Sequence, residues 1–346
     1  MLLLPFRTIT RGRWRRARWT FLALVLAAFA LYALTAVPYA FPGRSASWIA
    51  WAVGLDVREV PSRPVLTLLG RLAADIPLGP LALRLNLLAA LAGALTVGWV
   101  YKVVWFLIFD SMREESAVTF ASRNARFGGC LAALAVAVSL PFWQAATRFA
   151  PEIFDVAWVL ACAHLLTVYA RSQNLVWLLL FGALSGVGAA ESPLFIAASP
   201  VLLFFAVVVE WKLSWCRIGR LFSAAALAFL TLSSTHLFFA RAFVLAQGLP
   251  DSQAEIAQAV VSVWREQAGA IFALLPKTLW LPALGLGVGS ALFSFFCALR
   301  MLDNRRTWGL LFLGLLLTAS AALMLFNAPV TPWAVLAPRS EEHTSE

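Results

Sequence analysis

Long apolar stretches recur along this chain, and they limit its possible folds more than any other feature. Nine of them approach the roughly 20 residues that a helix needs to cross the hydrocarbon core of a bilayer. Helices are the expected spanning elements, because lipid offers backbone N–H and C=O groups no partners. The stretches lie near residues 19–40, 81–109, 127–146, 152–170, 175–190, 194–211, 221–245, 279–300 and 307–326.

The composition supports the same fold class. The chain is 62% hydrophobic and only 13% charged, which is more apolar surface than a soluble domain of 346 residues can bury. Transmembrane strands would alternate apolar and polar residues, and these stretches do not alternate. We therefore predict an all-α polytopic membrane protein with about nine transmembrane helices.

The basic residues are distributed in a way that predicts the orientation. Residues 7–18 carry six arginines, and further basic residues lie at 113–126, at Arg171, at 212–220 and at 300–306. With nine spans and an internal N-terminus, all of these clusters fall on one side of the membrane. This is the positive-inside bias, and it predicts that residues 1–18 are cytoplasmic. The net charge of +10 therefore indicates membrane lipid as a contact and no nucleic-acid partner.

Two longer segments lie on the outer side in this topology. The first, 41–80, contains two amphipathic pieces, 45–54 and 64–76, which we expect to be short helices. The second, 246–278, contains 252–275, where apolar residues recur at helical spacing. We expect that piece to be a helix lying along the membrane interface.

The last eight residues, 339–346, differ abruptly from the apolar chain before them. They read RSEEHTSE, which is polar and has no period. We interpret them as a non-native tail and exclude them from the fold. Residues 19–338 then form one transmembrane domain, and we expect the native protein to continue beyond it, so that the chain is truncated at its C-terminal end.

Several short motifs follow one another between about residues 20 and 210. They are Gly43-Arg44-Ser45-Ala46-Ser47, Glu59-Val60-Pro61-Ser62-Arg63-Pro64, Leu69-Gly70-Arg71, Arg84-Leu85-Asn86-Leu87-Leu88, Phe142-Trp143-Gln144, Glu152-Ile153-Phe154 and Leu180-Phe181-Gly182-Ala183-Leu184-Ser185-Gly186. Their order and spacing resemble a bacterial domain-of-unknown-function family related to protein O-mannosyltransferases, in the GT-C glycosyltransferase superfamily. The resemblance implies a GT-C-like fold in the bacterial inner membrane. It also implies transfer of a sugar from a polyprenyl-phosphate donor to an acceptor at the outer face.

The chain departs from this family at the residues that carry its chemistry. The family begins its first outside loop with Gly-Asp-Ser-x-Glu, where this chain has Arg44 and Ser47 in place of the two acids. Glu59 replaces a histidine, and Ala190-Glu191 replaces Asn-His. In GT-C enzymes the first acid is expected to act as general base on the acceptor. The sequence therefore leaves open both an active glycosyltransferase and a catalytically degenerate relative.

The remaining acids and arginines near the predicted outer face supply the candidate site. Sugar transfer needs a base for the acceptor and cations for the leaving phosphate. The predicted catalytic acids are Asp56, Glu59, Glu152 and Asp155. The predicted ligands of the substrate or its phosphate are Arg63, Arg84, Asn86, Arg148, Glu191 and Arg241. Each also has a plainer interpretation, such as a helix cap, a solvated turn or a snorkelling anchor.

The sequence gives no defined metal site. Glu152 and Asp155 share one helical turn and could bind a divalent ion, so the cofactor stays open. The four cysteines include no C-x-x-C pair, and neither a disulfide nor a zinc site is indicated.

Two other functions compete with sugar transfer. One is a non-enzymatic envelope protein that binds a lipid-linked glycan or a protein partner. The other is a transporter, which we disfavour because the chain has few charges in mid-span and no clear internal repeat. The acceptor is not defined by the sequence.

Overall fold

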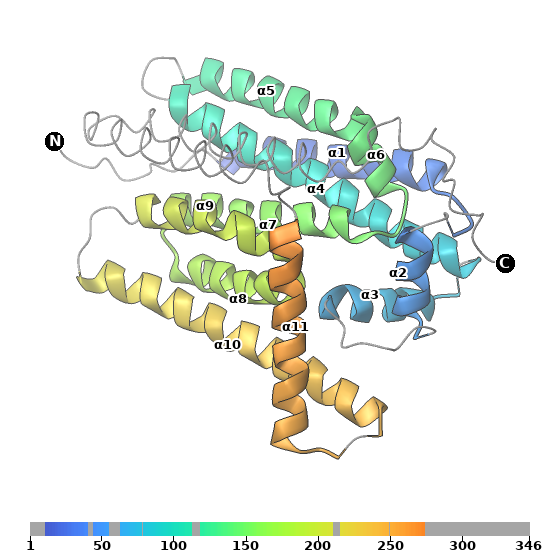
Figure 1. The fold of residues 1–346 in the computed structure, drawn as a ribbon. Coiled ribbons are helices and arrows are strands. Elements are labelled where there is room, and N and C mark those ends of the chain that lie inside the picture. Colours follow the sequence, from blue (N-terminus) through green and yellow to red (C-terminus); the bar gives the residue numbers. More distant parts are fainter. Residues whose placement is uncertain are drawn as a thin grey trace. The chain divides into compact units, whose positions relative to one another are not determined.

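The computed structural model describes residues 11–40, 44–54, 63–77, 79–112, 118–209, 215–248 and 250–273. These residues form helices and no strand (Figure 1). The chain divides into two units, Met1–Ala268 and Gly269–Glu346. The helices are α1 (Arg11–Thr35), α2 (Arg44–Ala52), α3 (Pro64–Ala74), α4 (Leu81–Met112), α5 (Val118–Val138), α6 (Leu140–Ala146), α7 (Pro151–Ser172), α8 (Leu175–Glu191), α9 (Pro193–Val209), α10 (Trp215–Ala246) and α11 (Gln253–Ala273). All belong to the first unit, except that α11 continues into the second.

Four of the described helices are long and apolar enough to cross a membrane. Their spans are Ala17–Thr35, Leu81–Phe109, Pro151–Ser172 and Ile218–Leu245, and a fifth is present if the bent pair α5 and α6 counts as one. An all-helical, multi-pass membrane protein is therefore confirmed, whereas nine spans are not. Helix α8 has only 17 residues, and the predicted spans 279–300 and 307–326 lie outside the described residues.

The predicted straight span at 127–146 is broken. Residues Ser122–Val138 and Leu140–Ala146 form two helices that meet at an angle of 70°. Pro141 lies in the first turn of α6, where its missing N–H costs nothing, but inside a continuous helix it would remove a hydrogen bond and clash with the preceding turn. Ser139 accordingly has an extended backbone conformation between the two helices.

Helix α4 is the centre of the first unit. It packs against α1, α5 and α7, and Figure 1 shows α1, α4 and α5 running beside one another. Tyr32 of α1 is completely buried, and its hydroxyl donates a hydrogen bond to the carbonyl oxygen of Ala137 at 3.0 Å. This contact ties α1 to α5 across the face of α4.

Helices α8 and α10 approach each other closely through glycines. A Cβ atom built on Gly182 would lie 2.3 Å from the carbonyl oxygen of Ala224, and one built on Gly186 would lie 2.0 Å from that of Ala228. Small residues spaced in this way let helix backbones meet, as they do in membrane-helix pairs. The glycines therefore serve packing and do not interrupt α8.

The short helices stand where the amphipathic pieces were expected. Helices α2 and α3 coincide with the pieces 45–54 and 64–76, and α3 contacts both α4 and α8. Helix α11 coincides with 252–275 and is held by Trp264, whose Nε1 donates to Nδ1 of His236 on α10 at 2.9 Å. Helix α3 is thus placed against the end of the helix bundle where α8 finishes.

Candidate functional site

A buried ion pair joins α3 to α7. Arg63 precedes the first turn of α3, and Asp155 lies near the start of α7. The two form a paired contact, with Nη1–Oδ1 at 2.5 Å and Nη2–Oδ2 at 3.0 Å. Their side chains are only 14% and 6% exposed. Because a guanidinium donates to both carboxylate oxygens at once, the pair fixes orientation as well as charge.

Glu191, the last residue of α8, completes the N-terminus of α3. Its Oε2 accepts from the N–H of Val65 at 2.7 Å, and its Oε1 accepts from the N–H of Leu66 at 3.0 Å. First-turn N–H groups have no partner within their own helix and carry partial positive charge. Glu191 is 3% exposed, so its carboxylate serves as a buried cap supplied by another helix.

Arg63 lies among three acids. Asp155 pairs with it directly, and Glu191 and Glu152 act on it electrostatically. Burial alone would lower the pKa of Arg63, but Asp155 and the two glutamates raise it above its ordinary value. Arg63 therefore lies close to acids of both α7 and α8 at one end of the helix bundle.

An aromatic pair covers the same arginine. The guanidinium carbon of Arg63 lies 5.8 Å from the centre of the Trp48 ring, which is within cation–π range. Trp48 in turn packs edge-to-face against Trp51 on α2, with ring centres 4.8 Å apart. Helix α2 therefore contributes a flat apolar surface to the cluster, and Arg63 contributes a charge.

Arg84 and Asn86 are engaged with backbone carbonyls and amides. Arg84 donates from Nη1 to Ala74 at 2.5 Å and from Nε to Gly79 at 3.0 Å, which closes the connection between α3 and α4. Asn86 is 1% exposed; it donates to the carbonyl of Val37 and accepts from the N–H of Phe149, both at 2.7 Å. Both residues hold the ends of helices together near the cluster.

The remaining predicted residues are placed differently from one another. Arg148 lies half-buried in the turn before α7, and burial lowers its pKa. Arg241 is exposed on α10 and pairs with Asp251, with Nη2–Oδ2 at 2.6 Å. Asp56 and Glu59 lie outside the described residues. The structure thus brings Arg63, Glu152, Asp155 and Glu191 together, while Arg241 is engaged elsewhere.

No metal centre is evident among the described residues, where no three His, Cys, Asp or Glu side chains gather closely enough to hold an ion. Both oxygens of Asp155 face Arg63. A divalent ion at this carboxylate would therefore have to compete with the guanidinium.

Two parts of this cluster escaped the sequence analysis. One is the pair of N–H donors at Val65 and Leu66, and the other is Ser192, which hydrogen-bonds to Asp155. A signal for the first was present, because α3 starts with Pro64 after Arg63 and has no Ser, Thr, Asp or Asn as its own cap. Such a helix start needs an acceptor from elsewhere in the fold.

Residues 45–215 match the family model described as "Protein O-mannosyl-transferase TMEM260 N-terminal domain". The matched range contains Arg63, Asp155 and Glu191. No curated protein and no solved structure matches the chain. Over the range that carries the buried cluster, the chain is therefore related to the protein O-mannosyltransferases.

Proposed function

We propose that the protein is a GT-C-like membrane glycosyltransferase, which transfers a sugar from a polyprenyl-phosphate donor to an acceptor at the outer face of a bacterial inner membrane. The relation to O-mannosyltransferases supports this class of reaction. The observation that carries the proposal is the gathering of Arg63, Glu152, Asp155 and Glu191 at one end of an apolar helix bundle. Acids and arginines at a membrane edge, beside lipid-facing helices, are what a lipid-phosphate substrate requires.

Glu152 is the acid that we assign as general base. It lies one turn before Asp155 on α7, so the two side chains share a face of that helix. Asp155 and Glu191 are buried, whereas Glu152 is only partly buried. It is therefore more accessible than either of these to an acceptor hydroxyl.

Residues of this chain can supply both the base and the phosphate ligand of the proposed reaction. Glu152 takes the proton of the acceptor O–H while that oxygen attacks the anomeric carbon of the sugar. The bond between this carbon and the phosphate oxygen breaks, and the polyprenyl phosphate leaves with its negative charge. Arg148, in the turn directly before α7, is the cation that we assign to the leaving phosphate.

Arg63 and Asp155 act as positioning residues in this scheme. Their paired contact fixes the start of α7, which carries Glu152, against the start of α3. Glu191 fixes the same start of α3 from α8. A charged group in these roles shapes the site without touching the reacting atoms.

The test is sugar transfer by membranes that contain the intact gene product. A polyprenyl-phosphate sugar with a labelled sugar serves as donor, starting with mannose because the matched family is described by that sugar. We expect Glu152→Gln to lower the transfer rate by roughly 100-fold or more, which is the usual contribution of a general base. Its amount in the membrane should stay unchanged.

Glu255→Gln is the matched control, because Glu255 is a partly buried acid in the first turn of α11. It should transfer sugar at the wild-type rate. Transfer by Glu152→Gln at that same rate would remove the assigned base.

A non-catalytic relative is the second candidate, favoured by one observation. Every carboxylate oxygen of Asp155 and Glu191 is used by a donor of the protein itself. In that case the protein binds the polyprenyl-phosphate sugar without turning it over. Wild-type membranes would then retain the labelled donor intact, and Arg148→Gln would release it.

A further inference from the structure

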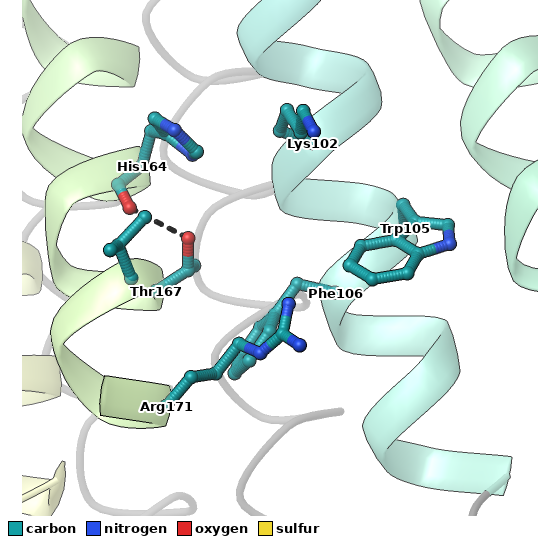
Figure 2. Close-up of a pocket in the computed structure, with 7 residues that line it drawn as sticks. Lys102, Trp105, Phe106, His164, Thr167 and Arg171 are labelled. Atoms are coloured by element: carbon teal, nitrogen blue, oxygen red, sulfur yellow. Dashed lines mark hydrogen bonds between the residues drawn. The ribbon is translucent and has the colours of Figure 1, made fainter. Parts of the chain in front are cut away.

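Two cavities of different size lie between helices of the first unit. One, drawn in Figure 2, lies between α4 and α7 near Lys102, His164 and Arg171. Its volume of about 10 Å³ holds roughly one water-sized group. The other lies between α8, α9 and α10 and has a volume of about 270 Å³, which is room for roughly nine such groups. Of these two, the second is large enough to hold part of a substrate.

We call the larger cavity the α8 cleft. Helices α9 and α10 both pack on α8, and Figure 1 shows α8 between them. The residues that line the cleft include Phe181 and Ala189 of α8, Phe195 and Leu203 of α9, and Ala228 and Phe229 of α10.

The wall of the cleft offers little to a polar ligand. Its two hydroxyl side chains donate within the protein, Ser185 to Sγ of Cys162 at 3.8 Å and Ser199 to the carbonyl oxygen of Ile196 at 2.8 Å. Every other lining residue is aliphatic, aromatic or glycine. Water stays in a cavity only where it finds about two to four polar partners, and an empty space deprives its lining of dispersion contacts. The cleft therefore suits a hydrocarbon group.

The cleft is accessible from the side of the bundle. Leu203 of α9 and Phe229 of α10 are exposed, whereas Phe181 and Phe195 are buried behind them. Phe229 belongs to the candidate span Ile218–Leu245, so its exposed side chain faces lipid when α10 crosses the bilayer. A hydrocarbon chain can therefore enter the cleft sideways from the membrane.

One end of the cleft adjoins polar groups. Ala189 lines the cleft, and Glu191, two residues further along α8, caps α3. Between them, the carbonyl oxygen of Ala190 accepts from Nε2 of Gln267 on α11 at 2.7 Å. We call Arg63, Glu152, Asp155 and Glu191 the Arg63 cluster. A ligand that fills the cleft therefore has hydrocarbon along its length and a polar end beside this cluster.

The dimensions of the cleft match one chain. Along α8 its lining runs from Phe181 to Ala189, which is about 12 Å of helix axis at 1.5 Å per residue. Carbon–carbon bonds are about 1.5 Å long, so two isoprene units have roughly this length, and their roughly ten carbons approach the volume of the cleft. The small wall residues Gly186, Ala189 and Ala228 leave space at the sides for methyl branches.

We propose that the α8 cleft holds the first two isoprene units of the polyprenyl-phosphate donor, with the phosphate at the end of α8 beside the Arg63 cluster. This inference rests on the proposed function and adds where the chain of the donor lies. The isoprene units beyond the second extend into the bilayer. The protein therefore recognises the part of the chain next to the phosphate and is indifferent to the total chain length.

Photolabelling in lipid nanodiscs tests the cleft without requiring sugar transfer. The probe is farnesyl phosphate with a diazirine in its second isoprene unit, and mass spectrometry of peptides locates the label. We expect saturable labelling of cleft residues on α8, α9 and α10. An excess of long-chain polyprenyl phosphate should abolish this labelling, whereas the same excess of phosphatidylglycerol should not. A diazirine in the third isoprene unit should label outside the cleft.

Ser199→Leu fills the cleft and should lower the saturable labelling at least fivefold. Ser223→Leu is the matched control, because Ser223 is exposed on α10 outside the lining and its hydroxyl also donates to a carbonyl of its own helix. It should be labelled as the wild type is. If Ser199→Leu cannot be recovered folded, Ala189→Leu at the polar end of the cleft takes its place, with Ala225→Leu, exposed on α10, as its control.

Three results overturn the proposal: equal displacement of the label by phosphatidylglycerol, labelling from the second isoprene unit outside the cleft, or unchanged labelling of Ser199→Leu. The sugar-transfer assay separates this inference from the proposed function. Transfer by the wild type without labelling of the cleft rejects the location of the chain and leaves the proposed reaction standing. Labelling of the cleft without transfer retains the location and rejects the reaction.

Discussion

Arg63 shows how one side chain sets the character of the candidate site. The sequence analysis assigned it to phosphate, but the structure gives its whole fork to Asp155. Taking two charges out of water is costly, and the cost is offset only when their geometry is good. Here the contact is bidentate, and Ser192 adds a hydrogen bond to Asp155. The ion pair therefore has a structural role, and removal of either partner leaves a buried charge without a counter-charge.

We predict that Asp155→Ala lowers the stability of the protein by about 3–5 kcal/mol, the usual cost of removing one partner of a buried ion pair. Thermal unfolding in detergent measures this. Asp251→Ala is the control, because it breaks the exposed pair with Arg241 and should shift the unfolding temperature far less. Equal shifts for the two variants would contradict a special role for the buried pair.

Among the elements, α8 makes close contacts both along one face and at its last residue. One of its faces meets α10 through Gly182 and Gly186, and its last residue caps α3 through Glu191. Because packed helices transmit displacement, a shift of α8 relative to α10 also moves the cap. The packing of α8 is thus linked to the position of α3.

We predict that Gly186→Ala destabilises the protein by about 1–3 kcal/mol, the usual cost of overpacking. Its Cβ would lie 2.0 Å from the carbonyl oxygen of Ala228 and from Oγ1 of Thr231, so the backbones must separate. The measurement is thermal unfolding, together with hydrogen exchange of the α3 amides, which should quicken. Gly219→Ala on α10 is the control, because nothing lies within 4 Å of its Cβ, and helix propensity should make it neutral or stabilising. An unchanged Gly186→Ala protein would argue against close contact of α8 and α10.

For the molecule as a whole, α4 and α7 run in parallel, so corresponding parts of the two helices lie toward the same side. Their starts carry the contacts of Asn86 and Asp155, whereas Lys102 and Arg171 lie further along the two helices. The basic loops predict that this second side is cytoplasmic. Orientation therefore decides which compartment the Arg63 cluster faces.

We predict that a cysteine at Asp75 is labelled by a membrane-impermeant maleimide in intact spheroplasts, and that one at Arg123 is labelled only after lysis. Both residues are exposed, and the variants are made in a background without the native cysteines. The physical reason is the positive-inside bias of the loops. Labelling of Arg123→Cys before lysis would reverse the proposed topology and place sugar transfer on the wrong side.

The sequence predicted local structure better than long-range pairing. Pro64 marks the start of α3, and apolar runs mark α1, α4, α7 and α10, because these signals lie within the segments themselves. Pro141 was equally visible, but only the fold shows the 70° bend beside it. Arg63 and Asp155 are separated by 92 residues. Nothing in the pattern of either segment specifies that partner, so the charged residues of the cluster were predictable from the sequence while the hydrogen bonds between them were not.

The contacts that Asp155 and Glu191 make with the start of α3 have a mechanical consequence. They come from different helices, α7 and α8, and they grip adjacent points at one tip. A single attachment would act as a hinge, whereas two attachments to different helices leave the tip of α3 much less free to turn. A displacement of this tip therefore has to break its contacts with both α7 and α8.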